Sequence, residues 1–171
     1  RIDGLSPSDR TLLRWASVLG VAFHVSDVRE VLASDPSAAL DDDAWDRLAE
    51  FVERDTTVAG GFRFRHQLIR DAAYEGLSFR RRRELHGRVA EVIEERNVAD
   101  PFDVAELLSL HFSRAGRAAE TWRYACEAAR RARAKWANRD AVELYRRALE
   151  ISQEVPDLEP SAIAEVWEAV A

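Results

Sequence analysis

Methionine is absent from this chain, cysteine occurs once, and no run of apolar residues is long enough to cross a membrane. A single thiol, Cys126, cannot form an internal disulfide, and its alanine-rich surroundings predict a small, buried and unreactive residue. Because no charged-then-apolar leader opens the sequence, we expect no export signal and a cytoplasmic location. A chain that begins at Arg1 and lacks methionine is expected to be a piece of a longer protein.

The sequence motifs of common catalytic sites are also missing. The only lysine, Lys135, has no glycines near it, which excludes a phosphate-binding Gly-x-x-x-x-Gly-Lys loop. Neither the dinucleotide-binding Gly-x-Gly-x-x-Gly nor the Gly-x-Ser-x-Gly of hydrolases occurs. The histidines, which are His24, His66, His86 and His111, do not pair with one another or with cysteine at metal-ligand spacing. We therefore predict that this segment is not an enzyme and binds no metal.

The residues that are present indicate a charged, mainly α-helical protein. The chain has 171 residues, a formal net charge of −6 and 33% charged residues. Helical periodicity predicts a first helix capped by Ser6 and closed by Gly20, a short helix after Ser26, and a third helix over about 42–54. A chain of this size can fold without a metal or a disulfide.

The hydrophobic period changes after the third predicted helix. Gly60-Gly61 lies between Val58 and the alternating run Phe62-Arg63-Phe64-Arg65, which predicts a tight hairpin with a half-buried strand. Three helices followed by a small hairpin is the element order of a winged-helix domain. The sequence therefore predicts a winged-helix-like domain with a short β-hairpin.

Helices resume at His66, and a turn-prone stretch at 97–101 divides the chain. The predicted domains are a winged-helix-like domain with a trailing helix over 1–98 and helical repeats over 99–171. The helix after His66 is expected to bury one apolar face, formed by Leu68, Ile69, Ala72, Ala73 and Leu77.

Beyond this boundary the apolar stripes predict antiparallel helical hairpins. The run 140–150 resembles the second helix of a tetratricopeptide repeat, and Ala125 and Ala129 take the close-packed positions of its first helix. A generic antiparallel helical bundle is the alternative. A last helix with Val166 and Trp167 is expected to present an apolar edge to a further repeat.

The run from Phe64 to Tyr74 and the arginine-rich stretch from Arg80 to His86 carry a family resemblance. The run resembles the Met-His-Asp-Leu region in the winged-helix domain of signal-transduction ATPases with numerous domains, the STAND class. It is also similar to the stretch that follows the ATPase module in large LuxR-type bacterial regulators and ATPase-linked adenylate cyclases, where tetratricopeptide repeats come next. In this chain Arg65 and Gln67 replace the Met and Asp of the receptor motif.

The resemblance implies a role for His66. In the family the motif histidine contacts the β-phosphate of ADP and holds the protein closed, so His66 is the expected nucleotide-contacting residue. The segment itself is expected to hold no cofactor, because ADP or ATP would bind in an ATPase domain that precedes it in the same chain. The alternative is that His66 only caps or packs the junction between hairpin and helix.

Two features bear on nucleic-acid binding. Arg80 to Arg83 stand in the first turn of a helix, where cations oppose the helix dipole, which suggests an acidic neighbour or simply solvated arginines. The stretch 41–55, in the position of a recognition helix, is strongly acidic and would repel DNA. Only Arg63, Arg65 and the arginine run argue for DNA, so nucleic acid is not the favoured partner.

These observations together predict a non-catalytic regulatory segment of a STAND-type ATPase that acts in signal transduction or transcription regulation. The expected partners are the preceding ATPase domain and a protein or small-molecule inducer that binds the helical repeats. A stand-alone scaffold of tetratricopeptide type is the alternative from a different functional class, and a winged-helix DNA-binding protein is a weaker one. No membrane partner is expected.

Overall fold

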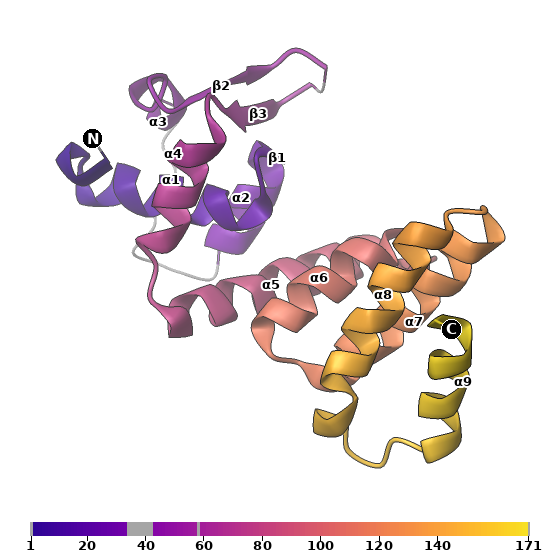
Figure 1. The fold of residues 1–171 in the computed structure, drawn as a ribbon. Coiled ribbons are helices and arrows are strands. Elements are labelled where there is room, and N and C mark those ends of the chain that lie inside the picture. Colours follow the sequence, from indigo (N-terminus) through magenta and orange to yellow (C-terminus); the bar gives the residue numbers. More distant parts are fainter. Residues whose placement is uncertain (1, 34–42, 58, 171) are drawn as a thin grey trace. The chain divides into compact units, whose positions relative to one another are not determined.

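The computed structural model describes residues 2–33, 43–57 and 59–170, and the chain divides into two units, residues 1–92 and 93–171. Figure 1 shows the elements of each unit. The first unit contains α1 (Pro7–Leu19), β1 (Ala22–His24), α2 (Val25–Leu32), α3 (Ala44–Arg47), β2 (Val52–Asp55), β3 (Gly61–Phe64) and α4 (Gln67–Glu75). Helix α5 (Phe79–Arg96) runs from the first unit into the second, which contains α6 (Ala105–Ala115), α7 (Ala118–Ala134), α8 (Asn138–Ile151) and α9 (Pro160–Val170). The prediction of a mainly α protein is confirmed.

Helix α1 begins as the sequence predicts. The Ser6 hydroxyl accepts a hydrogen bond from the backbone N–H of Asp9 at 3.1 Å, and Pro7 occupies the first turn. The inward face of the helix is fully buried and includes Leu13 and Ala16. This helix forms one wall of the core of the first unit.

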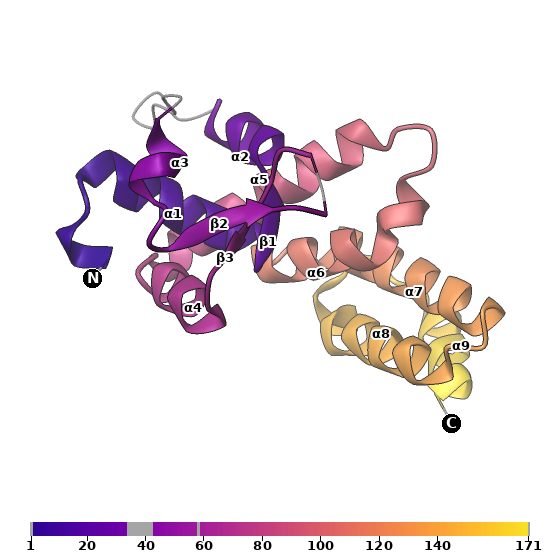
Figure 2. The ribbon, with the colours of Figure 1, turned by 90° about the horizontal axis from the view of Figure 1, so that it is seen from above.

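A small antiparallel sheet forms a second wall of that core. Its strand order is β1-β3-β2, with Phe23 opposite Phe62 and Val52 opposite Phe64. Figure 2 shows β3 lying beside both of its neighbours. Trp45 packs on this aromatic surface, with its ring centroid 5.0 Å from that of Phe62. The predicted alternation is confirmed over 62–65, because both phenylalanines are buried and both arginines are exposed.

Several details of the predicted hairpin region are wrong. The helix expected over 42–54 contains only Ala44–Arg47 within the described residues, because β-branched Val52 turns inward and begins β2. Gly60-Gly61 does not form the predicted two-residue turn, since Gly61 already pairs with Asp55 in the ladder. The expected hairpin residue Val58 lies outside the described residues.

The boundary between the two units lies within helix α5. Leu85 and Val89, in its first half, are buried in the first unit, whereas Glu94 in its last turn accepts hydrogen bonds from Arg123 and Tyr124 in the second. The division therefore falls between Val92 and Ile93, inside a helix. The boundary predicted from the sequence lies between residues 98 and 99, in the turn after this helix.

The second unit consists of consecutive helices that pack on one another. Helix α7 packs against both α6 and α8, and α8 packs against α9, as Figure 1 shows. Between α6 and α7, the rings of Phe112 and Tyr124 stack with centroids 5.6 Å apart. Helices α7 and α8 also contribute small residues to the core: Ala125 and Ala129 in α7 and Ala141 in α8 are almost completely buried.

The predicted apolar edge on α9 is wrong for Val166. Val166 is 5% exposed, because α9 packs against α8. Trp167, by contrast, is 60% exposed, as expected for a residue on that edge.

Candidate functional site

His66 lies at the junction between β3 and α4. Its backbone is extended, with φ −141° and ψ 140°, and its carbonyl accepts a hydrogen bond from the N–H of Ile69 at 3.0 Å. The imidazole makes no capping hydrogen bond to the helix and is exposed. The alternative role as a side-chain cap therefore has no support in this geometry.

The first turns of α4 expose an apolar residue next to this imidazole. Leu68 is 80% exposed, and Ala72, one helical turn later, is also exposed. The sequence predicted both residues on the buried face of this helix, and both predictions are wrong. The predictions for Ala73 and for Leu77, which follows the helix, are confirmed, because both residues are buried. Arg70 and Tyr74 in the same helix are half-buried. We call His66, Leu68 and Ala72 the motif face.

Arg70 and Tyr74, in the same run, have internal partners. The guanidinium of Arg70 lies 4.8 Å from the Tyr74 ring centroid, and its Nε donates to the carbonyl of Ser17 at 2.8 Å. The guanidinium of Arg82 lies 4.7 Å from the same ring centroid. The hydroxyl of Tyr74 lies 2.9 Å from Nε2 of His86, which is completely buried. This cluster joins α4, α5 and α1.

The arginine run also has local partners. Arg80 and Arg81 form ion pairs with Glu84 at 2.9 and 3.2 Å. The guanidinium of Arg81 also lies 4.8 Å from the ring centroid of Trp15, and that of Arg83 lies 5.9 Å from the ring centroid of Phe79. An acidic neighbour from outside the helix is therefore not needed to account for these arginines.

The arginines of the hairpin are compensated by a carboxylate on the adjacent strand. Glu53 forms ion pairs with Arg63 at 3.9 Å and with Arg65 at 3.2 Å. Arg65 also donates to the carbonyl of Ala49 at 2.7 Å. A DNA phosphate approaching this hairpin would have to compete with Glu53.

The Cys126 thiol and the His24 imidazole are taken up by the fold. Burial raises the pKa of the Cys126 thiol to about 11, so at neutral pH the thiol stays protonated and is a poor nucleophile. Nε2 of His24 lies 2.7 Å from the carbonyl oxygen of Ala59. Within residues 2–33, 43–57 and 59–170, no group of three or more His, Cys, Asp or Glu side chains could hold a metal ion.

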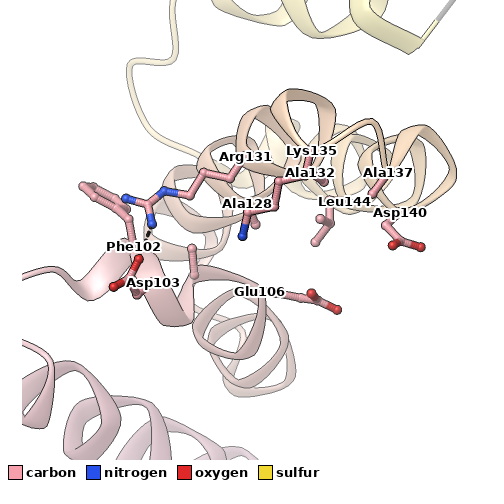
Figure 3. Close-up of a pocket in the computed structure, with 11 residues that line it drawn as sticks. Phe102, Asp103, Glu106, Ala128, Arg131, Ala132, Lys135, Ala137, Asp140 and Leu144 are labelled. Carbon is pink, nitrogen blue, oxygen red and sulfur yellow. Dashed lines mark hydrogen bonds and ion pairs between the residues drawn. The ribbon is translucent and has the colours of Figure 1, made fainter.

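A pocket of about 220 Å³ lies in the second unit, among α6, α7 and α8. Figure 3 shows Arg131 turned toward Asp103, to which it is bonded at 2.6 Å. Charged side chains of both signs surround an alanine-rich wall; the lining residues include Glu106, Lys135, Asp140, Ala128, Ala132 and Leu144. Sequence reasoning assigned inducer binding to this half of the chain but did not locate the pocket.

Comparison with known proteins gives no relative for this chain. No protein-family model, curated protein or solved structure matches it. The described part of the chain also contains no helix with the length and apolarity that a membrane span requires. The geometry of the motif face and of the second unit must therefore support any functional proposal.

Proposed function

We propose that this chain is a non-catalytic regulatory segment of a STAND-type signalling ATPase, which couples the nucleotide state of an ATPase domain to a partner-binding helical surface. One observation carries the proposal. Along the run from Phe64 to Tyr74, Phe64 is buried and Arg70 and Tyr74 make internal contacts, whereas the side chains of His66 and Leu68 are exposed. Exposed residues of a recognisable motif are those available to a second domain.

The arrangement of the first unit supports a winged-helix assignment. The chain order is α1, β1, α2, α3, β2, β3, and the sheet order is β1-β3-β2. A short strand between the first two helices that adds to the hairpin is what a winged-helix domain contains. The loop between β2 and β3 then corresponds to the wing.

The second unit supports a tetratricopeptide-like assignment. Such a repeat needs small residues where its two helices cross, and Ala125 and Ala129 in α7 and Ala141 in α8 are buried in two helices that pack on each other. Tyr145, also in α8, is 5% exposed. Stacked hairpins of this kind create extended surfaces that bind proteins or small inducers.

The proposed mechanism is a shift between closed and open states. In the closed state His66 would donate a hydrogen bond to the β-phosphate of ADP held by the ATPase domain, and Leu68 would pack on that domain. Loss of these contacts favours the open state by the free energy they contribute to the closed one. A loss of about 1.4 kcal/mol changes the ratio of the two states tenfold.

The test uses the full-length protein and the variants His66→Ala and Leu68→Ser. We expect both variants to release a fluorescent ADP analogue at least tenfold faster than the unmodified protein and to raise its basal output. Gln67→Ala is the matched control, because Gln67 is an exposed neighbour of both residues. Unchanged ADP release in both variants would refute the proposal, as would a parent sequence with no nucleotide-binding motif.

The stand-alone scaffold remains the second candidate, supported by the pocket and the exposed tryptophans of the second unit. DNA binding is less favoured because Glu53 compensates the hairpin arginines. A gel-shift titration at low salt separates these cases: we expect no tight complex with a DNA duplex, and a salt-sensitive one would favour the DNA-binding candidate.

A further inference from the structure

The pocket among α6, α7 and α8 has an apolar wall made largely of short side chains. Ala128 and Ala132 are four residues apart and Lys135 follows three residues later, so they lie on one face at the C-terminal end of α7. Leu144, from α8, belongs to the same wall and is 4% exposed. Because alanine fills little space, a volume of about 220 Å³ is left, below the range of about 300–1,000 Å³ that holds drug-sized ligands. The pocket therefore fits a smaller molecule.

Two of the charges that line the pocket compensate each other. Arg131 donates to Asp103 at 2.6 Å, and it forms further ion pairs with Asp100 at 3.1 Å and Glu127 at 3.3 Å. A guanidinium held by three carboxylates has no need of a ligand. Recognition of a bound molecule is therefore left to the other charged residues of the lining.

Those residues are Lys135, Asp140 and Glu106. The side chains of Lys135 and Asp140 make no hydrogen bond or ion pair with the residues that the structure describes. Glu106 interacts electrostatically with Arg147, but Arg147 does not line the pocket and its guanidinium donates to the Ser109 hydroxyl at 2.6 Å. All three lining side chains are exposed. The pocket thus presents one ammonium group and two carboxylates to solvent.

The presence of both signs restricts the ligand. A simple anion would be attracted by Lys135 but repelled by two carboxylates, and a simple cation would meet the opposite conflict. In the view of Figure 3 the carboxylates of Glu106 and Asp140 lie on the same side of the Lys135 ammonium, away from Arg131. A molecule with a negative group at one end and a positive group close by can satisfy both signs at once.

We propose that this pocket binds a free α-amino acid with an apolar side chain. The ligand carboxylate pairs with Lys135, its ammonium group with Asp140 and Glu106, and its side chain packs on the apolar wall of Ala128, Ala132 and Leu144. The interior of a peptide carries neither terminal charge, and a nucleic acid would be repelled by the two carboxylates. Such a ligand would be the inducer in the proposed function, on which this assignment rests.

The experiment is a titration of the 171-residue chain with L-leucine, followed by saturation-transfer difference NMR at low salt. We expect a dissociation constant below about 1 mM, which is modest because the charged groups stay exposed to water. Two analogues each remove one ligand charge: leucinamide lacks the carboxylate, and 4-methylpentanoate lacks the ammonium group. Each analogue should bind at least about fivefold more weakly than leucine.

Paired substitutions assign each ligand group to its residue. Lys135→Gln should weaken leucine binding at least about fivefold but should not weaken binding of leucinamide, which has no carboxylate to lose. Asp140→Asn should weaken leucine to a similar extent and should not weaken binding of 4-methylpentanoate. Arg133→Gln is the matched control, because Arg133 is an exposed cation of α7 that does not line the pocket, and it should leave leucine binding within twofold. Melting curves by circular dichroism verify that each variant is folded.

Several outcomes would overturn the proposal. These are failure of leucine to bind, unchanged leucine binding in both Lys135→Gln and Asp140→Asn, and an analogue that binds as tightly as leucine. Equally tight binding of acetyl-leucinamide, which carries no charge, would also overturn it and would favour an apolar side chain of a partner peptide. The proposed function has its own test, ADP release from His66→Ala, and a failure there leaves the leucine titration unaffected.

Discussion

The hydroxyl of Tyr74 lies 2.9 Å from Nε2 of the completely buried His86, and their rings meet edge to face at 5.8 Å. This pair joins α4, the helix that carries Leu68 and Ala72 of the motif face, to α5. Tyr74→Phe should lower the free energy of unfolding by about 1–2 kcal/mol, because a buried nitrogen loses a hydrogen-bond partner. Tyr74→Leu should cost about 1 kcal/mol more, since Arg70 and Arg82 also lose the ring. Guanidinium unfolding followed by circular dichroism measures both values, and equal losses would contradict a role for the ring.

The stability of the second unit should depend on His111. Burial, aided by Arg114, lowers the pKa of this histidine to about 4 from an ordinary value of 6.5. The unfolded chain therefore binds a proton that the folded chain does not between these values, and stability is lost as the pH falls from about 6.5 to about 4. The full loss from this group is about 3 kcal/mol.

The check is unfolding by guanidinium at pH 7.5 and at pH 5. His111→Leu should reduce the difference between the two pH values, whereas His66→Gln, at an exposed position, should not. If the unmodified chain and His111→Leu respond equally to pH, the folded pKa of His111 is not depressed.

An ion pair between α1 and α3 should set the acid stability of the first unit. Arg47 donates to both carboxylate oxygens of Asp9, with the shortest distance 2.7 Å, and this bond lowers the pKa of Asp9. The resulting stability is present above the unfolded pKa of 3.8 and is lost as the pH falls through the folded pKa. Asp9→Asn should cost about 1–3 kcal/mol at pH 7 and much less at pH 3. Asp3→Asn, at an exposed carboxylate, should have little effect at either pH.

Gly116, after α6, and Trp136, after α7, both have a positive φ, of 70° and 62°. Substitution should have opposite effects at the two positions. Trp136→Gly should stabilise the chain by about 1 kcal/mol, because glycine adopts a positive φ without steric cost. Gly116→Ala should destabilise it by a similar amount, since the new Cβ meets the same restriction. Thermal unfolding of the two variants checks both signs. A destabilised Trp136→Gly would mean that the tryptophan side chain contributes more to folding than its backbone conformation costs.

The strongly periodic elements were predictable from sequence, and the short ones were not. Helix α1 begins at its Ser6 cap, and α6 ends at Gly116, because these residues act on the backbone locally. Strand β1, with three residues, is too short to show an alternating pattern, and its pairing with β3 depends on distant residues. Helix α3 was overestimated because an apolar stripe continues into β2, where a strand replaces the helix.

The candidate surfaces show the same limit. The family resemblance selected His66. Periodicity predicted Leu68 on the buried face, although Leu68 is exposed, because the pattern of apolar residues takes no account of the contact between Arg70 and Tyr74. The unusual backbone of Trp136 could have been noticed from the sequence. The residue that ends a helix in this type of turn is commonly glycine, as at Gly116, and a tryptophan at the equivalent place departs from that rule.

Helix α5 has a consequence for cooperativity. In an α-helix each N–H bonds to the carbonyl four residues earlier, so the N–H groups of residues 93–96 bond to carbonyls of the first unit. The last helix of the first unit and the first turn of the second are therefore one hydrogen-bonded ladder. When either unit melts, this ladder frays from the melted end and removes support from the remaining half. Neither unit can then show the full stability that it has in the intact chain, and a fragment cut at either side of this helix should melt earlier than the whole.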